Sequence, residues 1–294
     1  MKNNLKQILE NSILFSKKTR IQKLLRKPSR MLTSKILQII SILFNSPIKI
    51  RAKTFWNDEM FVIVPEGVSL HIYHYGFFEE GLTKMMLEHL KPGMTFFDVG
   101  AHFGYYTLLG SSLFSDSGKV HAFEPTPSTF EILKSNTLKK SNVILNNLAV
   151  ASKRKTLVIN DYGIRYSAFN SVYNARLPQN IISKLSAKKY KIQAISIDEY
   201  VEENKITPDF IKIDAESFEY EILLGMKNTI DNFHPLITIE AGDMNVEGVP
   251  TCKELIEFLI NKGYKPYEFK DGKSLPHALK DTYTYENLLF LPKE

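Results

Sequence analysis

The sequence has very little cysteine, with Cys252 as the only one among 294 residues. A single thiol excludes an intrachain disulfide framework and any zinc site built from several cysteines, and it suits a reducing compartment. Long apolar runs are also missing. The longest, residues 36–44, is interrupted by Gln38 and Ser41 and is less than half of the roughly 20 residues that span a bilayer. We therefore expect a soluble, cytoplasmic protein with no transmembrane segment and no secretory signal.

Acidic residues are almost absent from the start of the chain. Residues 1–53 carry 13 Lys or Arg and one acid, Glu10, whereas the whole chain has a formal net charge of only +6. The remainder of the chain is therefore mildly acidic, and the basic character belongs to an N-terminal extension. Hydrophobic residues at 44% and charged residues at 24% are ordinary for a globular domain.

Apolar residues in this extension recur at helical spacing, and the pattern predicts two amphipathic helices around Pro28. The clearest stripe consists of Leu32, Ile36, Ile39, Ile40 and Leu43. Such faces pack on the body of the protein or on a second copy of the chain, or they form a basic amphipathic surface for anionic lipid or a lipid-linked substrate. No nucleic-acid partner is expected, because neither an aromatic platform nor a recognised binding motif accompanies the charge.

A regular alternation of strands and helices begins at residue 94 and runs to the end of the chain. The expected strands are residues 95–99, 120–123, 143–148, 156–160, 192–197, 210–213, 236–240, 264–269 and 287–291. This pattern predicts an α/β, Rossmann-like sheet that is mostly parallel, with helices on both faces. No long helix separates the last two strands, so the last strand should be antiparallel.

Two segments depart from this alternation. Residues 54–93 predict short strands over 55–76, with a turn at Pro65, and then a helix over 81–90. Residues 161–190 are polar, aromatic and irregular, which indicates an insertion over the sheet. We therefore divide the chain into an extension, a lead-in at 54–93 and a core domain at 94–294.

The first regular strand runs through Asp98 into a glycine-rich loop, Gly100-Ala101-His102-Phe103-Gly104, and then into a helix. Such a unit brings backbone close to a ligand. The D-x-G-x-x-x-G spacing lacks the G-x-G-x-x-G pattern that seats a pyrophosphate, which disfavours a nicotinamide cofactor. S-adenosylmethionine has no phosphate, and its ammonium needs an acceptor. Asp98 is placed to supply one.

The second strand ends in Glu124-Pro125. An acid at this position in such a fold can accept hydrogen bonds from both hydroxyls of a ribose, and the proline stops the strand. The rival interpretation is that the glycines only make a tight turn and that Glu124 is a solvated turn acid. Two motifs at the ends of consecutive strands favour the cofactor.

A second cluster of acids follows later strands. Asp214 and Glu216 end the strand at 210–213, and Glu240 ends the next one. One of these carboxylates could act as a general base, or Asp214 and Glu240 could bind a divalent cation such as Mg²⁺, or one could pair with Lys212 or cap a helix. His102 could contact the cofactor or act as a base, or it is an ordinary loop side chain.

These blocks together resemble the FkbM family of methyltransferases. The resemblance spans about residues 94–242 and rests on five stretches, DVGAHFGYYT (98–107), FEP (123–125), NLAV (147–150), DFIKIDAESFEYEILLG (209–225) and ITIE (237–240). It implies a class I methyltransferase sheet, S-adenosylmethionine as donor, and usually O-methylation of a hydroxyl on a sugar or a secondary metabolite. Two residues depart from the family pattern, His102 in place of the common Asn and Ser217 in place of Gly.

The resemblance also implies roles for individual residues. Asp98 and Gly100 would hold the methionine portion, Glu124 the ribose, and Asn147 would lie near the adenine. The full expected cofactor site is Asp98, Gly100, Ala101, Gly104, Glu124, Pro125 and Asn147. The expected catalytic residues are Asp214, Glu216, Glu240 and His102. Residues 1–93 and 161–190 would select the acceptor. The alternative functions are a non-catalytic module that binds the donor and a nicotinamide-dependent oxidoreductase.

Overall fold

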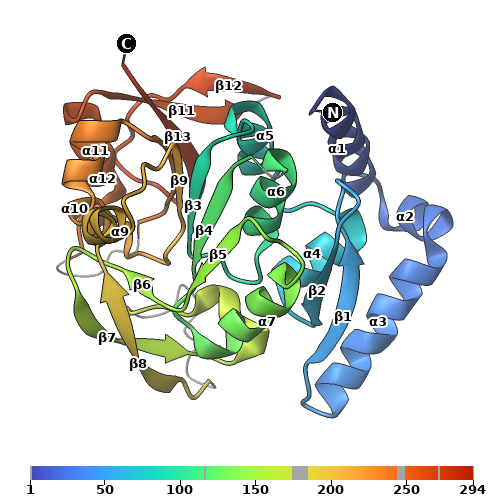
Figure 1. The fold of residues 1–294 in the computed structure, drawn as a ribbon. Coiled ribbons are helices and arrows are strands. Elements are labelled where there is room, and N and C mark those ends of the chain that lie inside the picture. The colour runs from blue at the N-terminus through green and yellow to red at the C-terminus, as the bar shows by residue number, and fades with distance from the viewer. Residues whose placement is uncertain (1, 116, 174–184, 244–248, 271, 294) are drawn as a thin grey trace.

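A computed structural model describes residues 2–115, 117–173, 185–243, 249–270 and 272–293. A large sheet crosses the middle of the molecule, and the N-terminal helices lie at one side of it (Figure 1). Among the described residues this main sheet has eight strands, in the order β12-β11-β13-β10-β9-β3-β4-β5. The expected α/β architecture is confirmed.

Apart from β12, which was not predicted, the strands of the main sheet lie close to their predicted positions. Their bounds are β3 Thr95–Val99, β4 Lys119–Phe123, β5 Val143–Asn146, β9 Phe210–Ile213, β10 Leu236–Ala241, β11 Tyr264–Lys270, β12 Lys273–Pro276 and β13 Glu286–Pro292. Strands β5, β4, β3, β9 and β10 pair in parallel, whereas β13 pairs antiparallel with both β10 and β11. The predicted antiparallel final strand is therefore confirmed, and it lies between its two neighbours rather than at the edge.

Helices cover both faces of this sheet (Figure 1). They are α5 Glu80–His89, α6 Tyr105–Phe114, α7 Pro127–Thr137, α9 Ile197–Asn204, α10 Glu219–Leu224, α11 Lys227–Phe233 and α12 Cys252–Asn261. Successive strand residues point to opposite faces, so Phe96 of β3 packs in the core on the α5 and α6 side and Phe97 packs in the core on the α9 and α12 side. Both side chains are fully buried.

The lead-in differs from the prediction. Strands β1 (Ile48–Lys53) and β2 (Glu59–Val64) form an antiparallel hairpin, but residues 67–75, expected as strand, form helix α4 (Gly67–Tyr75). The Glu66 carboxylate caps this helix by accepting hydrogen bonds from the backbone N–H groups of Val68 at 2.8 Å and Ser69 at 2.6 Å. The prediction was wrong because it followed the strand propensity of these side chains. The cap and the burial of Ile72 stabilise the helix and outweigh that propensity.

The extension contains three helices in residues 2–43, where two were expected. They are α1 Lys2–Ser16, α2 Arg20–Arg26 and α3 Pro28–Leu43. Thr19 and Gln22 form a capping box that starts α2, and Pro28 occupies the first turn of α3, where its missing N–H costs nothing. These local signals split the expected first helix in two.

A separate three-stranded sheet packs against the same hydrophobic core as the main one. It has the order β6-β8-β7, with β6 Ala149–Val150, β7 Lys155–Asp161 and β8 Lys188–Ile195. The expected strand at 192–197 is therefore part of this sheet and not of the main one. Within the expected insertion, residues 164–169 form the short helix η1 (Ile164–Phe169), and residues 174–184 lie outside the described part of the chain.

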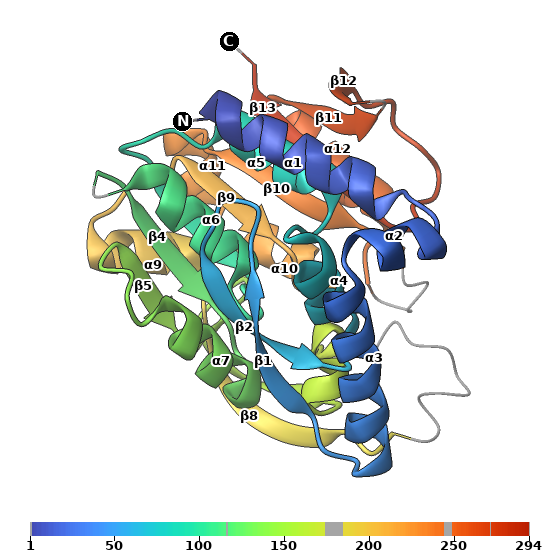
Figure 2. The same ribbon diagram turned by 90° about the vertical axis from the view of Figure 1, so that its right-hand side faces the viewer.

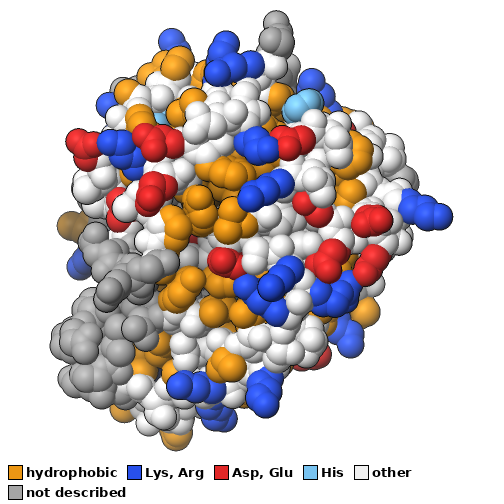
Figure 3. All heavy atoms as spheres, turned by 90° about the vertical axis from the view of Figure 1, so that its left-hand side faces the viewer, with side chains coloured by type: hydrophobic (Ala, Val, Ile, Leu, Met, Phe, Trp, Pro, Cys, Tyr) orange, Lys and Arg blue, Asp and Glu red, His pale blue; other side chains and the backbone are white. Residues whose placement is uncertain are grey.

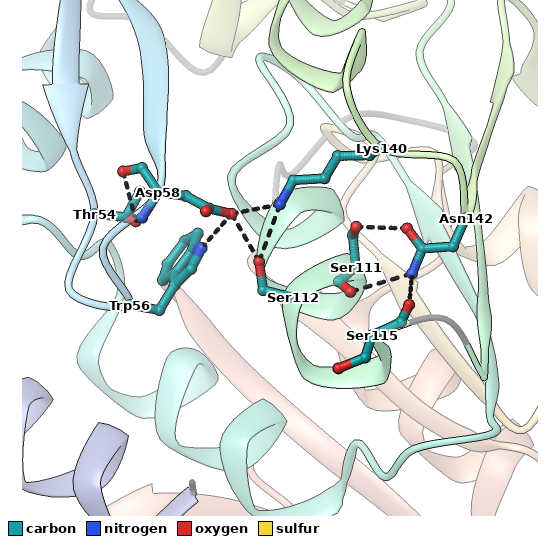
Figure 4. Close-up of polar contacts among 8 residues, drawn as sticks. All are labelled: Thr54, Trp56, Asp58, Ser111, Ser112, Ser115, Lys140 and Asn142. Carbon is teal, nitrogen blue, oxygen red and sulfur yellow. Dashed lines mark hydrogen bonds and ion pairs between the residues drawn. The ribbon is translucent and has the colours of Figure 1, made fainter.

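A polar network joins the lead-in to the core domain (Figure 4). The Asp58 carboxylate accepts hydrogen bonds from Trp56 at 3.1 Å, from Ser112 of α6 at 2.7 Å, and from Lys140 at 2.7 Å. Burial alone would raise the pKa of Asp58, but these three donors outweigh it and lower the pKa. The β1–β2 turn is thus fastened to the helix that follows the glycine-rich loop.

Candidate functional site

The chain order of the main sheet reverses between β3 and β9, which is the position where open α/β sheets bind ligands. A cavity of about 300 Å³ lies there. Its wall includes eight of the predicted residues, namely Gly100, Ala101, His102, Glu124, Pro125, Asp214, Glu216 and Glu240. Three predicted residues are not on this wall, namely Asp98, Gly104 and Asn147.

Glu124 is held in a defined orientation at the end of β4. Its two carboxylate oxygens accept hydrogen bonds from the backbone N–H groups of Thr126 at 2.9 Å and His102 at 3.0 Å. Burial raises the pKa of Glu124 to about 7, although both hydrogen bonds and the charge of Lys212 act against the rise. Each carboxylate oxygen can accept a further hydrogen bond, so the group can receive two hydroxyls side by side.

The glycines of the loop serve packing within the protein. A Cβ on Gly100 would lie 1.7 Å from the Asp214 carbonyl oxygen, so glycine lets the loop touch the end of β9. A Cβ on Gly104 would lie 2.6 Å from the Leu133 side chain. Both glycines have positive φ, at 74° and 91°. The D-x-G-x-x-x-G pattern therefore brings β3, β9 and α7 together, and it shapes the cavity through that packing.

Asp98 lies beneath the cavity and is fully buried. Its Oδ2 accepts a hydrogen bond from Thr107 at 2.6 Å, and its Oδ1 lies 3.4 Å from the Lys212 ammonium. Lys212 is itself on the cavity wall and only 2% exposed. Asp98 therefore contacts a residue of the cavity wall, Lys212, and does not line the cavity itself. Direct contact between Asp98 and the donor's ammonium stays a prediction.

Lys212 joins the carboxylates of neighbouring strands. Its ammonium lies 3.2 Å from Asp214 Oδ2 and donates a hydrogen bond to the Gly100 carbonyl at 3.2 Å. Burial alone would lower the pKa of Lys212, but Asp214, Asp98 and Glu79 outweigh it, so the pKa is raised and the lysine stays charged. The sequence analysis treated Lys212 only as a pairing partner, but the structure places it at the centre of the site.

The three carboxylates predicted at this edge do come together. Asp214, Glu216 and Glu240 each offer an oxygen within 4.8 Å of the others. Glu216 supplies the third potential cation ligand that the sequence did not single out, and it does so because the β9–α10 turn has positive φ at Glu216 and Ser217. This arrangement suits a general base or a bound cation.

His102 lies in the loop with φ of 50°. Its ring stacks on Phe103, and Nε2 is 2.8 Å from the Ser167 hydroxyl of η1. Burial lowers the pKa of His102 to about 4, so the imidazole is neutral near pH 7. A neutral ring with this pKa is a poor base, and its contacts favour a role in holding η1 over the cavity.

Glu79 is not on the cavity wall, but it binds two residues that are, Tyr106 and Tyr285, and it was not predicted. It accepts hydrogen bonds from Tyr106 at 2.8 Å, from Asn287 at 2.8 Å and from Tyr285. Burial and the nearby Asp214 carboxylate raise its pKa. Glu79 lies just before α5, and no motif signals it, because only the fold brings this residue to β13.

Asn147 does not line the cavity. Its side-chain amide donates hydrogen bonds to the carbonyls of Glu124 at 2.8 Å and Pro125 at 3.2 Å. The residue thus fixes the turn after β4. Any influence of Asn147 on the adenine would therefore be indirect, through the position of this turn.

The cavity fits S-adenosylmethionine in its chemistry. Its wall holds Glu124, which suits a ribose, and an acidic cluster that suits a cation. Apolar side chains such as Phe103, Leu148 and Phe218 line the rest of the wall. A mostly apolar cavity with a few placed polar groups is typical of small-molecule sites.

Comparison with known proteins identifies a family. The Methyltransferase FkbM domain model matches residues 98–266. The hexuronic acid methyltransferase AglP of Haloferax volcanii is 27% identical over 168 residues, which are 56% of this chain and 63% of AglP. The chain thus spans less than two thirds of that relative.

Two solved structures are similar to this chain at low identity. An FkbM methyltransferase from Methylobacillus flagellatus has 15% identity and a TM-score of 0.41, over 75% of this chain and 52% of that one. Aeropyrum pernix fibrillarin with natively bound S-adenosylmethionine has 11% identity and a TM-score of 0.40, over 68% of this chain and 67% of that one. Since the family match covers more than half of the sequence, the chain belongs to the FkbM methyltransferase family.

Proposed function

We propose that this protein is an S-adenosylmethionine-dependent O-methyltransferase that acts on a hydroxyl of a sugar or glycan. The observation that carries the proposal is one cavity whose wall holds Glu124 together with the Asp214, Glu216 and Glu240 carboxylates. The name of the relative, a hexuronic acid methyltransferase, supports a sugar as the acceptor class.

In this proposal Glu124 accepts hydrogen bonds from the ribose hydroxyls, and the acidic cluster with Lys212 faces the methionine end of the donor. S-adenosylmethionine supplies an activated methyl group. The protein contributes alignment of the acceptor oxygen, which can account for roughly 7–11 kcal/mol of a barrier. Residues 167–172 line the cavity and would exclude water from it.

One carboxylate of the cluster would take the proton of the acceptor hydroxyl. Asp214 is the weaker candidate, because its carboxylate is already paired with the Lys212 ammonium at 3.2 Å. Glu216 and Glu240 remain as bases. A divalent cation held by Asp214, Glu216 and Glu240 is the rival interpretation, and Lys212 weighs against it because an ammonium already pairs with one of the three.

Isothermal titration with S-adenosylmethionine tests the cofactor, and incubation with labelled donor and uronic-acid glycans tests the chemistry. We expect binding and methyl transfer by the unaltered protein, and loss of donor binding in Glu124→Ala. Donor binding without transfer to any glycan or small-molecule hydroxyl would favour the non-catalytic module. Binding of NAD in place of S-adenosylmethionine would favour the oxidoreductase and overturn the proposal.

A further inference from the structure

Helix α3 buries two serines and exposes most of its apolar side chains. Ser34 and Ser41 are 2% and 3% exposed, and the Ser41 hydroxyl donates a hydrogen bond to the Val64 carbonyl at 3.2 Å. The opposite side carries the predicted apolar stripe, and all of it is exposed to solvent. Its members are Leu32, Ile36, Ile39, Ile40 and Leu43, at 39–74% exposure. A helix that only packed on the body would face the other way.

The exposed apolar surface extends beyond α3. Ile21, Leu24 and Leu25 of α2 are 72%, 42% and 77% exposed, and Phe44 is 75% exposed. Helix α1 differs, because it buries Leu9 and Ile13 in the core. We call α2, α3 and Phe44 the arm. In Figures 1 and 2 α3 lies along the outer edge of the molecule, beyond the hairpin β1–β2.

The arm is fastened to the body, so its exposure is a property of the folded protein. The Lys27 ammonium lies 4.9 Å from the centre of the Phe15 ring, and the Arg30 guanidinium lies 5.5 Å from that of Tyr73. Ser41 adds its hydrogen bond to β2. These contacts use the side of α3 that faces the protein and leave the stripe free.

The charge of this region has one sign. Residues 17–35 contain eight Lys or Arg and no acid, while the rest of the chain beyond the extension is acidic. On the face shown in Figure 3, by contrast, Lys and Arg are interspersed with Asp and Glu. Aliphatic side chains beside a purely basic segment are the features of a helix that lies on an anionic bilayer.

The charge of the arm also disfavours a second copy of the chain or a nucleic acid as its binding partner. A symmetric dimer through the arm would bring two basic segments face to face, and like charges disfavour such a contact. A nucleic acid would neutralise the charge but would leave the isoleucines in water. No helix in the described residues has the length and apolar character to cross a bilayer, so contact would be confined to the membrane surface.

We propose that the arm docks the protein on an anionic lipid surface. The C-terminal end of α3 adjoins the cavity region, because Ser41 and Pro47 share a second pocket with Tyr162 and Ile164. That segment continues into residues 167–172, which line the main cavity. Docking through the arm would therefore hold the main cavity close to the membrane, where a lipid-linked acceptor would be found.

Vesicle co-sedimentation of the full chain tests this proposal. We expect binding to vesicles of phosphatidylcholine with about 30% phosphatidylglycerol, weak binding to phosphatidylcholine alone, and loss of binding at high salt. The triple variant Ile36→Ser, Ile39→Ser, Leu43→Ser should bind at least ~10-fold more weakly. A second variant, Arg20→Gln, Arg26→Gln, Lys35→Gln, should weaken binding to the vesicles that contain phosphatidylglycerol. It should leave the weak binding to phosphatidylcholine alone unchanged.

The matched control is Leu138→Ser with Leu279→Ser, two exposed leucines outside the arm at 80% and 40% exposure, which should bind like the unaltered protein. Circular dichroism and S-adenosylmethionine affinity, unchanged in every variant, establish folding. Equal binding by the triple variant would overturn the proposal, as would no binding by the unaltered protein. A dimer in light scattering that the triple variant loses, without vesicle binding, would assign the arm to a second copy instead. Because the assay needs no methyl transfer, its failure is separable from failure of the proposed function.

Discussion

The buried carboxyl of Glu124 should make donor affinity depend on pH. Burial raises its pKa to about 7, so the group is largely protonated at pH 6 and ionised at pH 8. Two hydroxyl donors favour the ionised form, hence affinity for S-adenosylmethionine should rise with pH through this range. For a pKa near 7 the dissociation constant should fall about 10-fold from pH 6 to pH 8.

Titration calorimetry at several pH values measures this dependence. His102 does not interfere, because its pKa of about 4 keeps it neutral throughout. The variant Glu124→Gln should bind weakly and with a flat profile. An unaltered protein whose affinity is constant from pH 6 to pH 8 would remove Glu124 from the donor site.

The base should be identifiable by single substitutions in the acidic cluster. Replacing the general base with its amide should lower kcat by about 10²–10⁴-fold while leaving donor affinity within a few fold. We expect this pattern for Glu216→Gln or Glu240→Gln. Asp214→Asn should instead weaken donor binding, because it leaves Lys212 with fewer charge partners.

The readout is kcat and donor affinity for each variant. If both glutamate variants keep kcat within tenfold of the unaltered protein, neither is the base.

Metal removal distinguishes the two interpretations of the acidic cluster, a general base and a cation site. With Lys212 already paired to Asp214, we expect EDTA to leave methyl transfer unchanged and added Mg²⁺ to have no effect on it. The assay is initial rate after chelation and dialysis. Loss of activity that Mg²⁺ restores would show that Asp214, Glu216 and Glu240 hold a cation.

At the scale of elements, the Asp58 network should carry part of the stability. Asp58→Ala removes three hydrogen bonds to a charged group that is partly exposed, so the free energy of unfolding should fall by about 1–3 kcal/mol. In the unaltered protein this contribution to the free energy of unfolding is lost at low pH, because the pKa of Asp58 is lowered in the fold. The substitution should therefore cost less stability at low pH than at pH 7. Urea unfolding at pH 7 and at about pH 2, below the ordinary pKa of 3.8, measures both effects, and an equal loss at the two pH values would contradict the second.

Elements with a strong local pattern could be predicted from the sequence. Strand β3 and helix α6 follow from an apolar run and the glycine loop, and β3 has the bounds predicted for it. Helix α4 could not be predicted, since its strand-forming side chains are overridden by the Glu66 cap and by packing. Helix α11 was missed because it follows α10 after a turn of only two residues.

The residues of the site also divide into those that the sequence could predict and those that it could not. Residues at the carboxyl ends of strands, such as Glu124 and Asp214, were predictable because parallel strands end at one edge. Glu79 was not, because its partner Asn287 lies 208 residues away and only the complete sheet brings them together. The burial of Asp98 beneath Lys212 likewise depends on packing that no spacing encodes.

At the scale of the whole molecule, the cavity wall draws on residues from Met60 of the lead-in to Tyr285 beside β13. Donor bound there contacts the lead-in and the core domain together, so it should stabilise them as one unit. At a concentration 100 times the dissociation constant, binding contributes about 2.7 kcal/mol, which raises Tm by roughly 5–10 °C for a protein of this size. Differential scanning calorimetry should show a single transition that moves upward with S-adenosylmethionine and does not move with NAD. Glu124→Ala should lose most of the shift, whereas Leu138→Ser, which lies on the surface, should keep it. If the donor moved only one of two separate transitions, the lead-in and the core would not share the ligand, and the cavity would not be the donor site that the carboxylates indicate.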